Sequence, residues 1–158
     1  MIIRKTITSS QKEILDLPDD ENIEIILEIQ KGNAELSIRS ENRKPQTVML
    51  NVIHRNPNTG SRITLNSIVK SRLIVDAKLT MEKDSKGSKG SISMNAIKVG
   101  KNAEADFSPK LVVLNNDVEA EHKSSIQNIP ADAISYLMSR GMDKKDSEGL
   151  FCERFLCQ

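Results

Sequence analysis

Few side chains in this sequence are of the kinds that carry chemistry. Among its 158 residues the chain has two histidines, His54 and His122, and two cysteines, Cys152 and Cys157. Five positions along a helix turn through about 500°, so the two thiols would lie on different faces. We therefore expect one packed and one frayed cysteine rather than a metal clip or a redox pair. For His122, the choice is between a ligand or proton acceptor and a polar residue at a strand end.

Other motifs offer little support for catalysis. The lysine- and glycine-rich stretch 83–91, KDSKGSKGS, lacks the spacing of a phosphate-binding loop, so we expect a solvated loop between strands. No Ser-His-Asp order or paired carboxylates stand out, and we predict that the protein is not an enzyme. Arg140 precedes Gly141 at a predicted helix end, where it either satisfies terminal carbonyls or contacts a partner.

The composition also excludes several classes of partner. The 23 basic and 22 acidic residues nearly balance, and with no Trp, one Tyr and three Phe the chain has little surface for stacking on bases. The start MIIRKTITSS has too short an apolar run for a signal peptide, and no stretch is long enough to span a membrane. We expect a single-domain cytoplasmic protein with neither nucleic acid nor membrane as a partner.

Apolar residues alternate with polar residues over most of the chain, which predicts strands with one buried face. The alternation begins at Asn22, and polar turn-forming stretches separate its runs. A sandwich, a barrel and a β-solenoid all fit short alternating strands, but few hairpin dipeptides and mostly aliphatic core positions favour the solenoid. We assign residues 21–125 to this mostly β body. Residues 1–20 form an N-terminal arm that either caps the body or trails free.

The period changes after Ser125, and residues 126–158 form a predicted C-terminal region of two helices. Pro130 suits the first turn of the first helix, and Gly141 suits its C-terminal cap. Asp143 to Ser147 can start the second helix. We expect the apolar side of that helix to pack on the β body, with a groove for a partner as the alternative; this side consists of Leu150, Phe151 and Phe155.

Three stretches of the chain resemble the SufB/SufD family. AEHKSSIQNIPADAISYLMSRGM is similar to the C-terminal signature of that family, in which a His and a polar run lead into a helix with a Tyr-Leu-x-x-Arg-Gly motif. Upstream, HRNPNTGSRITLNSIVKSRLIVDAKLTME and ADFSPKLVVLNNDVEAEH also resemble family segments, so the resemblance covers about residues 48–156. It implies a right-handed parallel β-helix closed by C-terminal helices. The β-helix would be truncated, because family members usually carry more coils.

The resemblance also implies a function. Such subunits pair through their β-helices, dock a SufC-type ABC ATPase through the helical region, and together assemble iron–sulfur clusters. His122 falls where the family has a His on the subunit seam, and His54 matches a family His to which we assign no role. The residues that fall in the ATPase-docking region are Ala133, Tyr136, Leu137, Arg140 and Gly141.

Two departures from the family pattern concern the cluster. SufB-type members carry an acidic residue where this chain has Lys123, and a cysteine where it has Met94, and a thioether is a poor ligand for cluster iron. We therefore expect no permanently bound cofactor and a transient iron–sulfur cluster only within a complex. The partner would be the protein itself or a longer SufB/SufD-type paralogue. The alternative is a β-helical structural or interaction module that self-associates and has lost cluster chemistry.

Overall fold

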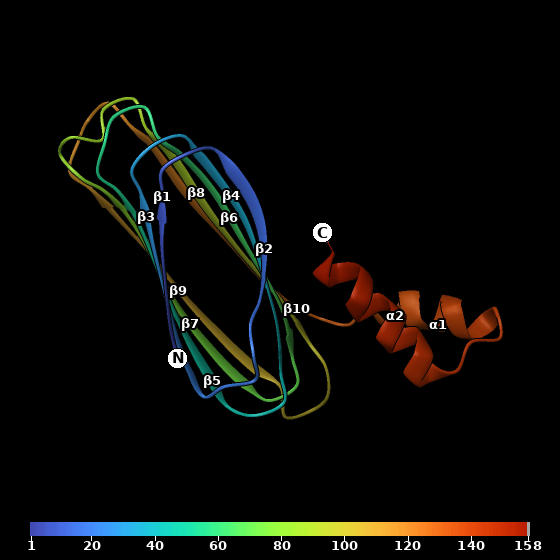
Figure 1. The fold of residues 1–158 in the computed structure, drawn as a ribbon. Helices are drawn as coiled ribbons and strands as arrows, with labels where there is room; N and C mark the ends of the chain where they lie inside the picture. Colours follow the sequence, from blue (N-terminus) through green and yellow to red (C-terminus); the bar gives the residue numbers. More distant parts are fainter. Residues whose placement is uncertain (158) are drawn as a thin grey trace.

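Alternating strands wind into a parallel β-solenoid in the computed structural model, which describes residues 1–157 (Figure 1). Consecutive strands lie in opposite sheets, so the chain coils and each strand pairs with the strand two places along the sequence. The first sheet contains β1 (Ile2–Ile7), β3 (Asn22–Ile29), β5 (Gln46–His54), β7 (Arg72–Met81) and β9 (Glu104–Val113). The second contains β2 (Gln11–Asp16), β4 (Asn33–Asn42), β6 (Gly60–Val69), β8 (Lys89–Lys98) and β10 (Glu119–Asn128).

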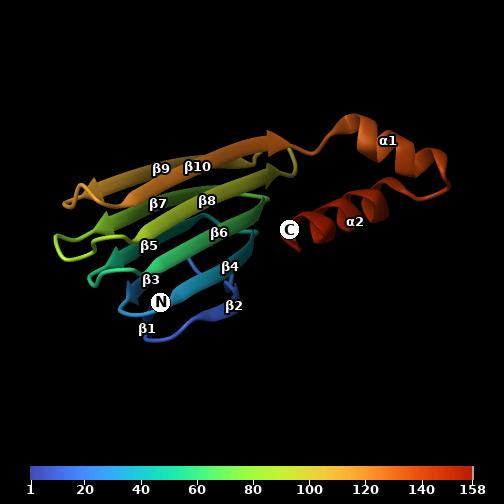
Figure 2. The same cartoon turned by 90° about the horizontal axis from the view of Figure 1, so that it is seen from above.

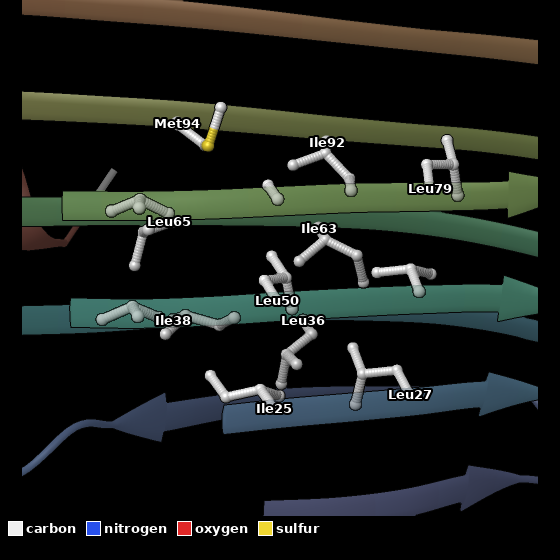
Figure 3. Packing of buried hydrophobic residues seen from close by; sticks show 14 of the residues in the cluster. Ile25, Leu27, Leu36, Ile38, Leu50, Ile63, Leu65, Leu79, Ile92 and Met94 are labelled. Carbon is white, nitrogen blue, oxygen red and sulfur yellow. The ribbon is translucent and has the colours of Figure 1, made fainter. Parts of the chain in front are cut away.

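The core consists of columns of aliphatic side chains that run along the solenoid axis (Figure 3). Parallel pairing in register places Leu36 beside Ile63 and Ile63 beside Ile92, all facing the interior between the sheets. Because side chains alternate between the two faces of a strand, a slip of one residue would turn the whole apolar set outward. The alternation therefore determines both the pairing and the core, and the prediction of a solenoid is confirmed.

The first turn of the solenoid consists of β1 and β2, which lie within the predicted N-terminal arm. β1 pairs with β3 and β2 pairs with β4, and Ile7 and Leu17 join the core. At this end two inward positions are charged: Lys5 lies in register with Leu27, and its ammonium group donates to the carboxylate of Glu13 from the opposite sheet. Residues 1–20 thus cap the solenoid, and the first two strands extend it beyond the predicted body.

Two helices follow the last strand and form a helical hairpin: α1 (Ala131–Ser139) and α2 (Lys144–Leu156). Pro130 directly precedes α1, and Gly141 adopts φ +91° after it, a conformation that favours glycine. The N–H groups of Gly141 and Met142 return to the carbonyls of Met138 and Leu137, which satisfies the end of the helix. The carboxylate of Asp143 accepts from the Asp146 N–H at 2.7 Å and caps α2. The predicted turn at Gly141 and the predicted start of α2 at Asp143 are confirmed, whereas Pro130 lies at the N-cap, one residue before the first turn in which it was predicted.

Candidate interaction surfaces

The last turn of the solenoid leaves its interior uncovered. Strands β9 and β10 form the last turn of the stack in Figure 2. No described strand pairs beyond them, and their inward-facing side chains lie at the surface or half-buried. We call this surface the open end; it consists of Phe107, Pro109, Leu111, Val113, Ala120, His122, Ser124 and Ile126. Leu111, Val113 and Ile126 are 36%, 48% and 41% exposed, although they occupy core positions of the pattern. The open end is therefore an apolar surface without a cover within the described chain.

His122 lies near the middle of the open end. In the second sheet, residues at equivalent positions of successive strands form a column that begins with Glu13 at the N-terminal end of the solenoid. Ile92 is the last buried residue of this column, and His122 ends it. Leu111 ends the column that Lys5 begins. Leu111 and His122 therefore both lie at the open end, in opposite sheets. The imidazole is thus an exposed donor or acceptor beside an aliphatic surface.

No resident metal site accompanies His122. Met94 of the neighbouring strand β8 is in register with Ser124, two residues along from His122. Its side chain is fully buried, so β8 places a thioether in the core beneath the open end. Over residues 1–157 no three His, Cys, Asp or Glu side chains are grouped so that they could hold a metal ion. A permanently bound metal would need several such ligands together.

The backbone of the open end differs between its two strands. In β10 the Glu119 N–H bonds to Ser88, so the backbones of Ala120, His122 and Ser124 face the free edge. In β9 the Leu114 N–H bonds to Met81, so the odd-numbered residues, including Pro109, face the free edge. Proline has no N–H, and it interrupts the row of donors on β9. Only β10 offers an uninterrupted edge.

The helical hairpin forms a second surface, which projects from the side of the solenoid (Figures 1 and 2). Helix α1 packs on α2, which lies nearer the sheets. Tyr136 is 59% exposed, and the Arg140 guanidinium lies 5.3 Å from its ring centroid and donates to its hydroxyl at 3.3 Å. This cation–π contact fixes both side chains on the exposed face of α1.

The structure gives the predicted docking residues different positions. Tyr136, Arg140 and Gly141 are exposed, whereas Ala133 and Leu137 are half-buried in the hairpin. Arg140 makes its side-chain contact with Tyr136, while the backbone of the turn satisfies the terminal carbonyls. Its guanidinium therefore remains accessible to a partner.

Helix α2 fixes the hairpin to the outer face of the second sheet. Phe155 is buried against Ile68 of β6 and Ile97 of β8, and the amide of Asn66 donates to its carbonyl at 3.5 Å. Phe151 joins this contact, as the sequence predicts for the apolar side of α2. Leu150 differs from that prediction and is 46% exposed, because its position on α2 faces away from the sheet.

The two cysteines and His54 lie in three different environments. Cys152 is half-buried in the α2 contact, where burial raises the pKa of its thiol, and Cys157 is exposed. His54 is fully buried, and its ring nitrogens lie 2.7 Å from the hydroxyls of Thr59 and Ser61. Burial lowers the pKa of His54 to about 4, so the ring is neutral at neutral pH.

A polar groove of about 1080 Å³ runs along the starts of the strands in the second sheet. Ala34, Ser61 and Gly90 lie in register on neighbouring strands and are among the residues that line the groove. The charges in the groove are paired across strands, as in Lys12 with Glu35 and Lys89 with Glu119. This groove was not predicted from the sequence, although small residues recur at equivalent positions of successive strands.

Comparison with known proteins agrees with the resemblance seen in the sequence. Residues 21–155 match the family described as "SUF system FeS cluster assembly, SufBD core domain". An iron–sulfur cluster assembly SufBD family protein of Staphylococcus haemolyticus is 25% identical over 107 residues, which cover 66% of this chain and 23% of that protein. Proteins of the same description from Staphylococcus epidermidis and Staphylococcus aureus match to the same extent. The chain thus corresponds to about a quarter of the length of these relatives.

Proposed function

Because the chain belongs to the SufBD core domain family of the SUF iron–sulfur cluster assembly system, we propose that it is a non-enzymatic subunit of a cluster assembly complex. In this role it pairs with a like subunit through the open end and docks a SufC-type ABC ATPase through the helical hairpin. The cluster is cargo formed within that complex rather than a resident cofactor.

The exposure of α1 is the observation that carries the docking proposal. The helix presents Tyr136 and Arg140 to solvent as a fixed pair, while α2 alone makes the extensive contact with the solenoid. Aromatic and arginine side chains are enriched among the residues that dominate binding energy at protein interfaces. An exposed helix with this pair is suited to insertion into a groove of a partner.

The open end supports the pairing proposal. Its exposed aliphatic side chains are those that the next turn of a solenoid would cover, and its free β10 edge can accept another strand. His122 would then lie on the seam between two subunits, where groups of both subunits could contact a transient cluster.

The same surface also favours a second candidate function. Met94 lies buried where SufB-type members have a cysteine, so this chain offers no thiolate at that position for cluster iron. Under this alternative the chain is a structural or interaction module that self-associates and has lost cluster chemistry. The hairpin would then be only a cap for the second sheet.

Complex formation with the SufC-type ATPase of the same genome tests the docking proposal. The purified proteins are mixed without oxygen and analysed by gel filtration with light scattering. We expect a complex that Arg140→Glu weakens, because the substitution reverses the charge and removes the contact with Tyr136. Circular dichroism of the variant verifies that the helices remain folded.

Lys86→Glu provides the matched control. Lys86 is 76% exposed and lies in the loop before β8, at the opposite end of the strands from the hairpin, so the same change in charge should leave the complex intact. Equal binding by Arg140→Glu and wild type would refute docking through α1. Absence of any complex with wild type would favour the structural module instead.

A further inference from the structure

The edge of the solenoid at which the helical hairpin leaves is rich in cations. The strands β4, β6, β8 and β10 all end at this edge, so the turns after β4, β6 and β8 lie on the same side of the molecule as the hairpin (Figure 2). Exposed basic side chains stand on these turns or on the residue directly after one. We call this set the basic edge; it consists of Arg43, Lys44, Lys70, Arg72 and Lys101.

Two carboxylates neutralise only part of the basic edge. Glu41 lies 3.2 Å from the Arg43 guanidinium and 2.6 Å from the Lys70 ammonium group, and Glu104 lies 3.9 Å from the Arg72 guanidinium. Lys44 and Lys101 form no ion pair within residues 1–157. The basic edge therefore keeps an excess of positive charge, although the 23 basic and 22 acidic residues of the whole chain nearly balance.

The first turn at the same edge has the opposite charge. Between β2 and β3 the chain carries Asp19, Asp20 and Glu21, which we call the acidic turn. The Asp19 carboxylate accepts from the Arg43 N–H at 3.0 Å, so the acidic turn lies directly beside the first turn of the basic edge. Successive turns are about 4.8 Å apart, and charges are screened over about 8 Å at physiological salt. The charges of neighbouring turns thus act together, and the edge is negative at its N-terminal end and positive beyond it.

The basic edge is continuous with the hairpin and suits a compact acidic partner. Val99, two residues before Lys101, joins the buried contact that holds Phe155 of α2 on the second sheet. A protein that covers the hairpin would therefore lie beside the basic edge. A DNA duplex carries a negative charge about every 1.7 Å along its axis, so along this edge it would extend over the acidic turn. An acidic patch on a folded protein can face the basic edge alone, which spans about 10 Å.

We propose that the basic edge faces an acidic surface of the ATPase that docks on the hairpin, and that its field steers and orients the docking partner. The inference rests on the proposed docking function and specifies the charge of the partner beside the hairpin. Because the side chains of the basic edge are exposed, each ion pair across the interface adds little affinity. Their summed field mainly raises the rate of association, and the acidic turn disfavours the reversed orientation of the partner.

Association kinetics with the SufC-type ATPase of the same genome test this inference, measured without oxygen at low and at high salt. We expect the double variant Lys44→Glu, Lys101→Glu to associate roughly 10-fold more slowly at low salt, with the difference shrinking at high salt. The double variant Asp20→Lys, Glu21→Lys should instead associate faster. Lys78→Glu, Lys110→Glu is the matched control, because both lysines are exposed and lie in register on the outer face of the first sheet. Its association rate should stay close to that of wild type.

The outcomes separate this inference from the function on which it rests. A complex that Arg140→Glu weakens, but that forms as fast with the Lys44→Glu, Lys101→Glu variant as with wild type, would overturn the role of the basic edge while docking stands. Equal slowing by the Lys78→Glu, Lys110→Glu control would show an effect of net charge alone and would also overturn it. Binding of a DNA duplex that depends on Lys44 and Lys101, with unchanged ATPase association, would assign the edge to nucleic acid instead. Absence of any complex with wild type would overturn both proposals.

Discussion

Protonation of His54 is expected to destabilise the solenoid in mild acid. The ring is fully buried, and as a neutral imidazole it donates to one hydroxyl and accepts from the other, those of Thr59 and Ser61. A charged ring would lack water and would have donors on both sides. Burial therefore lowers the pKa from 6.5 to about 4 in the folded state.

The size and sign of the effect follow from proton linkage. Between the two pKa values the unfolded chain binds a proton at His54 that the folded chain does not, so stability falls as pH falls. Each unit of pKa difference corresponds to about 1.4 kcal/mol, so lowering the pH from about 7.5 to about 4.5 should remove roughly 2 to 3 kcal/mol through this group. The free energy that the neutral His54 ring contributes to stability is fully present above the pKa that His54 has in the unfolded chain.

Urea unfolding monitored by far-ultraviolet circular dichroism measures this loss. His54→Gln provides the comparison, because its amide keeps a donor and an acceptor but does not titrate. Exposed carboxylates such as Asp16, whose pKa the hydrogen bond from Arg39 lowers, titrate equally in both proteins. The free energy of unfolding of wild type should fall by roughly 2 to 3 kcal/mol more than that of the variant. Equal losses in the two proteins would refute the burial argument.

Further substitutions test other parts of the fold. Gly141→Ala should destabilise the hairpin by about 1–2 kcal/mol because its φ of +91° strains any side chain, whereas Gly149→Ala, in open space within α2, should raise thermal stability slightly. Phe155→Ala should cost about 3 kcal/mol of local stability and expose α2 to hydrogen exchange, while unchanged protection of α2 would show that Phe155 is not its anchor. Replacing Lys5 and Glu13 together by leucine should create association at the N-terminal end, visible as larger species in sedimentation, and a dimer unchanged in size would contradict the capping role of the ion pair.

The strands of the middle turns were predictable because burial there follows the simple alternation. Ile23, Ile25 and Leu27 of β3 all face the core, and their neighbours in register are equally apolar. The same alternation predicts that Leu111 and Val113 are buried. They are instead exposed, because period two indicates which face of a strand is inward but not whether another turn covers it.

The first turn was not predicted because charged residues occupy its inward positions. Lys5 and Glu13 interrupt the apolar period of β1 and β2, and the compensating ion pair joins two strands in opposite sheets. The role of His54 was hidden for a similar reason. Thr59 and Ser61 are ordinary residues of a turn and the next strand until the fold brings them against the ring.

The position of α2 has a mechanical consequence for the whole solenoid. Although the hairpin follows β10 in sequence, its buried contacts are with Ile68 and Ile97 on β6 and β8. A force applied to α1 thus reaches the solenoid by two routes: through the short link to β10, and through α2 to interior turns that hydrogen bonds hold on both sides. The second route shares the load with the interior turns, so that less of it acts on the edge strand β10.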